Sequence, residues 1–144
     1  EAANAAPACM GQYDHLHLTV VQKPEILTQI NAAFQKAVGD PNMQVTYGAP
    51  TVIYVSCKNE DEEIIKGCNA GVVMENMLLE AADLGLGAVY LFGVSQVLFT
   101  NEEITKLLQI PEGFRTVSAI AVGTSADVLQ ERALGTDKIS TTTL

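Results

Sequence analysis

Basic side chains are scarce in this sequence. Its 144 residues carry 8 Lys and Arg against 17 Asp and Glu, which gives a net charge of −9. The basic residues also stand singly along the chain, so no basic patch is visible. Because nucleic acids and anionic membranes are bound through clustered Lys and Arg, the sequence argues against both as partners.

Long hydrophobic runs and secretory features are missing as well. Hydrophobic residues make up 48% of the chain, but glycines and acidic residues interrupt its most apolar stretch, 72–92. No run approaches the roughly 20 apolar residues of a bilayer span. The first residues lack the basic start and apolar centre of a signal peptide. They look like the end of a helix that begins without Met, and we therefore expect a preceding segment that is absent from this sequence.

Cysteine and histidine are too few and too poorly spaced for a metal site. Cys9, Cys57 and Cys68 match no zinc-binding pattern. His15 and His17 would share one face of a strand, packed or lining a pocket, and they lack a third ligand. The acidic run 60–63 is interpreted as a solvated loop that leads into a helix. The sequence therefore predicts no metal, and buried, reduced thiols in a cytoplasmic protein.

The most apolar segment predicts a central helix from about Glu62 to Leu84, and Gly85 supplies its end. The helix is apolar on nearly all sides, which is typical of a buried helix. A single domain of this length cannot hide such a helix unless a second sheet layer or a second subunit covers its other side. The mean hydropathy of +0.20 also indicates extra buried surface, as in an oligomer interface.

The rest of the chain alternates strands with helices. Strands are predicted at 16–21, 51–57, 88–92 and 116–122, and further helices at 24–38 and 101–109. This order indicates an α/β or α+β class, and the strand 51–57 is apolar on both faces, as a central strand would be. The tail 124–144 is polar and has no core of its own, although 139–144 could pair as an edge strand. We expect the tail to be loose or to lie on a neighbour.

Five sequence segments carry a resemblance to a known family. They are Ala-Pro-Ala-Cys-Met-Gly at 6–11, the strand reached by Val20-Val21, Gly-Ala-Pro at 48–50, Asn-Met-Leu-Leu-Glu-Ala-Ala-Asp-Leu-Gly-Leu-Gly at 76–87, and Ile-Pro-Glu-Gly-Phe at 110–114 before Ile-Ala-Val-Gly at 120–123. In order and spacing, the chain from about Ala2 to Gly123 resembles the nitroreductase-like FMN-dependent flavoproteins. The resemblance implies a single α+β domain over 1–144, with a mixed, mostly antiparallel central sheet flanked by helices. It also implies a homodimer with FMN in clefts at the subunit interface, and a tail 124–144 that packs on the partner.

The resemblance further implies which residues bind the cofactor. They are Pro7, Ala8, Cys9, Met10 and Gly11 in a loop against the flavin of the second subunit, Leu91, Phe92 and Gly93 beside the flavin ring, and Arg132 and Lys138 at the phosphate. The loop departs from the family pattern, since Ala8 replaces a Ser and Gly11 an Asn. Tyr13, His15 and Asp14 also replace the family's Gln, Trp and Pro. We expect Tyr13 to anchor its loop, or else to stack near a ring. The arginines of the family's N-terminal segment have no counterpart in this sequence.

The function implied by the resemblance is an oxidoreductase that passes reducing equivalents from NAD(P)H through FMN to a small aromatic or quinone-like acceptor. A flavin carries its own redox chemistry, so no acid–base pair is required, and no catalytic side chain is assigned. An alternative is a relative with a degenerate flavin site that binds flavin or another small ligand without reductase activity. A purely structural dimer is a third possibility. The sequence does not distinguish NADH from NADPH.

Overall fold

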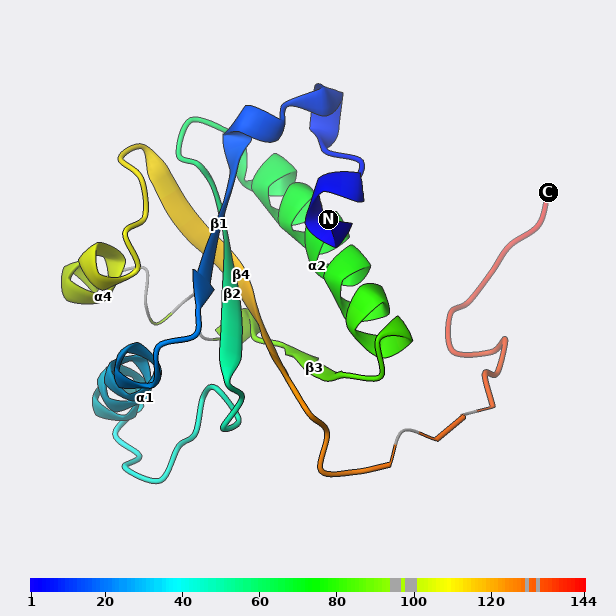
Figure 1. The fold of residues 1–144 in the computed structure, drawn as a ribbon. Helices are drawn as coiled ribbons and strands as arrows, with labels where there is room; N and C mark the ends of the chain where they lie inside the picture. The colour runs from blue at the N-terminus through cyan, green and yellow to red at the C-terminus, as the bar shows by residue number, and fades with distance from the viewer. Residues whose placement is uncertain (94–96, 98–100, 129, 132) are drawn as a thin grey trace.

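The central feature of the computed structural model is a four-stranded antiparallel sheet. The model describes residues 1–93, 97, 101–128, 130–131 and 133–144. The strands β1 (Leu16–Val21), β2 (Thr51–Lys58), β3 (Gly87–Tyr90) and β4 (Phe114–Gly123) lie in the order β1-β2-β4-β3 (Figure 1). All three strand pairs are antiparallel, so the described strands show no parallel pairing. The α+β class is confirmed, and β2 is an inner strand, as its two apolar faces predicted.

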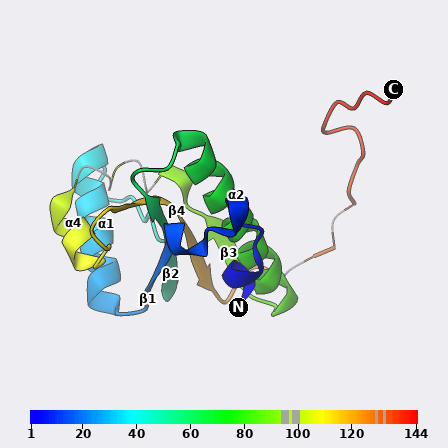
Figure 2. The same cartoon turned by 90° about the horizontal axis from the view of Figure 1, so that it is seen from above.

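Helices cover both faces of this sheet. On one face lie α1 (Pro24–Val38) and α4 (Glu102–Leu107), and on the other lies α2 (Glu63–Asp83) (Figure 2). Three short 3₁₀ segments, η1 (Ala2–Ala5), η2 (Cys9–Gly11) and η3 (Tyr13–His15), precede β1 on the α2 side. Each sheet face therefore carries its own core, one centred on Ile30 and Tyr54 and the other on Met74 and Ile120.

The helix ends follow from local sequence. Pro24 occupies the start of α1, and Gly39 ends it with a φ of 75°, while its amide donates to Gln35 O at 2.9 Å. Asn101 caps α4, because its side chain accepts a hydrogen bond from Ile104 N at 3.2 Å. Gly85, with a φ of 69°, reverses the chain after α2.

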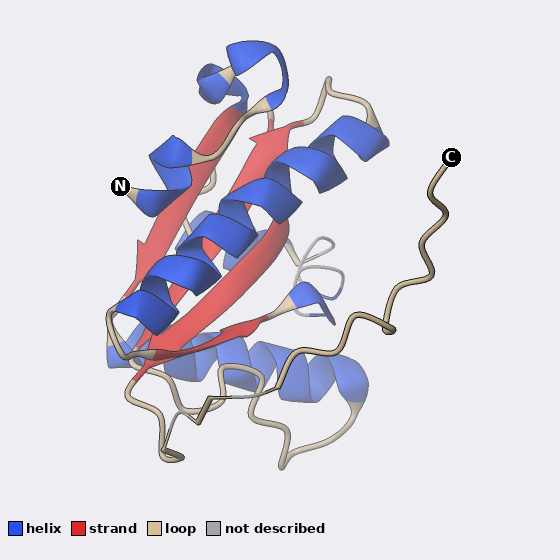
Figure 3. Cartoon of the chain, turned by 90° about the vertical axis from the view of Figure 1, so that its right-hand side faces the viewer, coloured by secondary structure: helices blue, strands red, loops and turns tan. Residues whose placement is uncertain are grey.

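The central helix is not covered on all sides within one chain. Ala70, Val73 and Met74 face the sheet, whereas Leu79 on the other side is 61% exposed. Figure 3 shows α2 lying diagonally over the sheet as the outermost layer of that face. A Cβ added at Gly71 would meet nothing within 4 Å. No second sheet layer lies over α2 in the described part of the chain.

Several local predictions are wrong. Cys68 is exposed and Cys9 is half-buried, so only Cys57 is a buried thiol. His15 lies in η3 and only His17 lies in β1, so the two do not form one strand face. Asp61 is not solvated, because its side chain is 9% exposed. The segment 139–144 forms no strand and is exposed (Figure 1).

Among the described residues, no group of three His, Cys, Asp or Glu side chains is placed to hold a metal ion. No helix in the same part of the chain is long and apolar enough to cross a membrane.

Candidate functional site

The loop that contains the first predicted site residues lies against α2. Its η2 segment has left-handed backbone at Met10 (φ 55°) and Gly11 (φ 68°), and the Met10 side chain is 87% exposed. The backbone amide of Cys9 donates to Asn69 Oδ1 at 2.8 Å, and Asn69 is buried in α2. A buried amide side chain in an apolar helix needs a partner, and here the partner is the loop. Asn69 therefore fixes the position of η2.

Two more contacts hold the same loop. Tyr13 Oη donates to Ala6 O at 3.0 Å, which confirms the prediction that Tyr13 anchors the loop. His15 Nδ1 lies 2.7 Å from Asp61 Oδ1, and both side chains are largely buried. This contact ties the end of the loop to the segment between β2 and α2.

The electrostatic contacts around this loop are local ion pairs. Lys58 Nζ lies 3.2 Å from Asp14 Oδ2, and its hydrogen bond lowers the pKa of the Asp14 carboxyl. Hydrogen bonds from Lys66 and then Arg115 likewise lower the pKa of Glu63. Lys66 is buried and also donates to Asn59 O at 2.9 Å. These cations serve the fold, since each already has a carboxylate partner.

The second group of predicted residues follows β3 and has different neighbours. Leu91 is buried, and its amide donates to Ala119 O at 2.7 Å, which continues the β3–β4 ladder by one residue. Phe92 and Gly93 are exposed beyond that point. They line a groove of about 180 Å³ together with residues of the 43–47 loop. In one chain, this group and the loop 7–11 therefore lie against different elements.

The two predicted phosphate ligands are not equally described. Lys138 is exposed and lies in the tail that follows β4, outside any helix or strand. Arg132 lies outside the described residues. Their role in binding phosphate stays a prediction.

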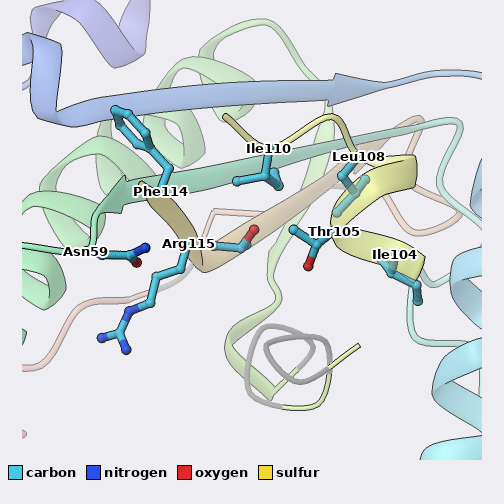
Figure 4. A pocket seen from close by; sticks show the side chains of 8 residues that line it. Asn59, Ile104, Thr105, Leu108, Ile110, Phe114 and Arg115 are labelled. Carbon is cyan, nitrogen blue, oxygen red and sulfur yellow. The ribbon is translucent and has the colours of Figure 1, made fainter. Parts of the chain in front are cut away.

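A separate cavity of about 320 Å³ lies between α4 and the start of β4 (Figure 4). Leu108, Ile110 and Phe114 form its apolar wall, and Arg115 lies at the Asn59 end. None of the predicted site residues lines it. Sequence reasoning missed this cavity because it forms only when α4 packs beside the sheet.

Cys57 is the most protected of the three thiols. Burial raises its pKa to about 11, with a smaller contribution from Asp61, and Sγ lies 3.8 Å from Lys66 O. Because the thiolate is the reactive form, we expect Cys57 to resist a thiol reagent at pH 8 until the protein unfolds. Counting the chromophore that the reagent releases before and after denaturation tests this. Cys57→Ser should remove one equivalent that appears only after denaturation; loss of a rapid equivalent in Cys57→Ser would contradict the assignment.

The chain is similar to known proteins in both sequence and fold. A protein-family model described as the nitroreductase family matches residues 1–124. A protein of Methanothermobacter thermautotrophicus named "Putative NADH dehydrogenase/NAD(P)H nitroreductase" is 30% identical over 131 residues, which are 88% of this chain and 63% of the relative. The chain thus spans less than two thirds of that relative's length.

Solved structures show the same fold. A Bacteroides fragilis nitroreductase with bound FMN superposes with a TM-score of 0.80 at 22% identity, covering 98% of this chain and 82% of the other. A Desulfitobacterium hafniense nitroreductase with bound FMN gives 0.82 at 20% identity, with the same coverage. An FMN-dependent nitroreductase of Clostridium difficile gives 0.76 at 23% identity, covering 98% and 84%. Since the family model covers most of its length, the chain belongs to the nitroreductase family.

Proposed function

We propose that this protein is an FMN-dependent oxidoreductase that takes reducing equivalents from NAD(P)H and passes them to a small aromatic or quinone-like acceptor. The family membership supports an oxidoreductase, and the solved relatives named above carry or depend on FMN. The observation that carries the proposal is the loop 7–11, which α2 holds in place through Asn69 while leaving Met10 and Gly11 exposed.

The described residues leave room for the flat ring of a flavin. A Cβ added at Gly11 or Gly93 would meet nothing within 4 Å, so both backbone segments border open space. The phosphate end is less complete, because Lys58, Lys66 and Arg115 are already paired with carboxylates. Lys138, together with Arg132, would hold the phosphate in this proposal.

The chain's own contribution would be to bind, orient and shield. A bound flavin supplies the redox chemistry. The backbone of the loop 7–11 and of Phe92 and Gly93 would hold the ring, and Asn69 would position the loop through Cys9 N. No described side chain is required to exchange a proton with the acceptor.

A second copy of the chain would complete this site. The loop 7–11 and the residues 91–93 have different neighbours in one chain, and the outer face of α2 is uncovered. We propose that two copies pack through this face of α2, so that each cleft takes the loop from one subunit and residues 91–93 from the other. The tail 124–144 would then lie on the partner.

Binding of FMN tests the proposal directly. The protein is incubated with FMN and freed of excess flavin, and the visible absorbance of the bound flavin is measured. Adding NADH or NADPH under anaerobic conditions should then bleach this absorbance. Asn69→Leu should weaken FMN binding about tenfold, because a buried hydrogen bond to the loop is worth about 1 kcal/mol or more. Asn76→Leu is the matched control. Asn76 lies on the same helix as Asn69, but it donates to Ala2 O, away from the loop.

The outcomes separate the two candidate functions. Bound flavin that neither NADH nor NADPH bleaches would favour a flavin-binding protein without reductase activity. This alternative is suggested by Ala8 and Gly11, which stand where the family has side chains that form hydrogen bonds. Failure to retain any FMN would refute the proposed enzyme. Equal FMN affinity in the Asn69→Leu and Asn76→Leu variants would remove the role given to Asn69.

A further inference from the structure

One contact of the loop 7–11 joins two titratable side chains. His15 Nδ1 lies 2.7 Å from Asp61 Oδ1, and the two side chains are 15% and 9% exposed. The contacts of the Cys9 amide and the Tyr13 hydroxyl instead end on an amide oxygen and a carbonyl oxygen, which do not ionise. Histidine is the side chain whose charge ordinarily changes between about pH 5 and pH 8. The contact between His15 and Asp61 is therefore the one whose strength can follow pH in that range.

Asp61 is the fixed side of this contact. It lies in the turn between β2 and α2, beside η3 (Figure 1). Asn59 N donates to Gly113 O at 2.7 Å, which ties the turn to the start of β4. Lys66 Nζ donates to Asn59 O at 2.9 Å, which ties the same turn to α2. His15 therefore attaches the loop to a rigid support.

Both nitrogens of the His15 ring face a carboxylate oxygen. Asp14 Oδ2 lies 3.9 Å from Nε2, on the side of the ring opposite the Asp61 contact. Asp61 Oδ2 is buried without a hydrogen-bond partner among the described residues, so the bond from His15 is the one that this side chain receives there. A buried carboxylate is costly unless a positive charge compensates it. An imidazolium donates from both nitrogens, so the protonated ring is the form that matches both carboxylates.

The other titratable groups on the neighbouring elements have contacts of their own or are exposed. They are Lys58 with Asp14 and Glu60, Lys66 and Arg115 with Glu63, the Cys57 thiol with Lys66 O, His17 with the ring of Phe114, and exposed Glu62. Carboxylates, ammonium groups and guanidinium groups ordinarily titrate outside the range from about pH 6 to pH 8. Burial raises the pKa of the Cys57 thiol to about 11. A change of pH within that range therefore acts on these elements through histidine.

We propose that His15 is a positioning residue whose positive charge, acting on Asp61, holds the loop 7–11 in its flavin-binding conformation. The role in flavin binding rests on the proposed function, whereas the coupling of the loop to this charge does not require flavin. When the ring loses its proton as the pH rises, Nδ1 can still donate to Asp61, but the charge that compensates the carboxylate is gone. The loop is then held less firmly, and FMN binding weakens. Since the family pattern has Trp at this position, the pH dependence is expected of this chain and not of the whole family.

Nuclear magnetic resonance of the flavin-free chain tests the coupling. The chain has two histidines, so His17→Asn assigns the two sets of ring signals. Between about pH 6 and pH 8, the Cys9 amide resonance should shift with the same midpoint as the His15 ring. In His15→Asn this shift should disappear, because Asn keeps a donor near the position of Nδ1 but carries no charge. In the matched control His17→Asn the shift should persist.

FMN titration of the same proteins measures the consequence for binding. Dividing the Kd of His15→Asn by that of the wild type at each pH cancels the ionisation of the FMN phosphate, which falls in the same range. This ratio should be about fivefold at pH 6, because a hydrogen bond between two charged groups is stronger than one from a neutral donor. It should approach one at pH 8, where the wild-type ring is neutral as well. The same ratio for His17→Asn should stay close to one at both pH values.

The two measurements separate this inference from the proposed function. A Cys9 resonance that follows the His15 ring in a chain that binds no FMN at either pH would uphold the coupling and refute the enzyme. Bound FMN together with a Cys9 resonance that does not follow the His15 ring, or with a His15→Asn ratio that is independent of pH, would overturn the inference and leave the enzyme intact. Circular dichroism checks that both variants are folded, and the wild-type titration decides the coupling even where a variant is not.

Discussion

Replacing Ile120 with Ala is expected to lower the free energy of unfolding by about 3 kcal/mol, within the roughly 2–5 kcal/mol typical of buried Ile→Ala changes. Ile120 lies in the middle of β4, is 0% exposed, and packs in the core between the sheet and α2 with Val73 and Met74. Removing three carbon atoms there loses apolar burial and leaves a cavity, because helix and sheet cannot close over it.

Urea unfolding followed by far-ultraviolet circular dichroism measures this loss, at a fixed protein concentration so that association contributes equally. Val38→Ala is the control, since Val38 is 43% exposed at the end of α1, and its effect should stay within about 0.5 kcal/mol. Similar effects from the two substitutions would mean that the α2 layer does not pack on β4 as described.

The elements were predictable because their signals are local. The stripe of Leu27, Ile30 and Phe34, bounded by Pro24 and Gly39, specifies α1 within fifteen residues. The alternation in β1 and the doubly apolar β2 likewise required no tertiary information. Their antiparallel pairing was expected only through the family resemblance, because short apolar strands do not reveal their neighbours.

The contacts that shape the site could not be predicted in the same way. Cys9 and Asn69 are 60 residues apart in sequence, as His15 and Asp61 are 46 apart, and neither pair has a sequence pattern of its own. An Asn in an apolar helix was a usable signal, since its burial requires a partner, but the partner could not be named. The acidic run that contains Asp61 was predicted to be solvated because the partner of Asp61, His15, could not be named from the sequence.

Exposure was the least predictable property of the central helix. Its composition indicated burial all round, yet the sheet can cover only one of its sides, which leaves Cys68 and Leu79 outward. The apolar sequence pattern reflects burial in the final assembly, whereas the structure of one chain shows only the burial that its own helices and strands provide. The disagreement at these two residues therefore points to the surface that we propose a second subunit covers.

Leu79→Glu is expected to weaken this proposed dimer about 100-fold. Leu79 is 61% exposed on the outer side of α2, where an interface through this helix would bury it. A two-fold interface brings the same patch from both subunits together, so one substitution places two carboxylates in a desolvated contact. A cost of about 3 kcal/mol corresponds to that loss of affinity.

Sedimentation velocity over a dilution series measures the change, and Val38→Glu is the matched control. Val38 is 43% exposed at the end of α1, on the opposite face of the sheet, and its substitution adds the same charge to a chain of net charge −9. Val38→Glu should therefore sediment as the wild type does. Because the flavin cleft is proposed to combine residues of both subunits, Leu79→Glu should lose FMN at the concentrations where it dissociates. A monomeric wild type, or a Leu79→Glu dimer of unchanged affinity, would show that α2 is not the interface and would leave the loop 7–11 without the partner that its proposed role requires.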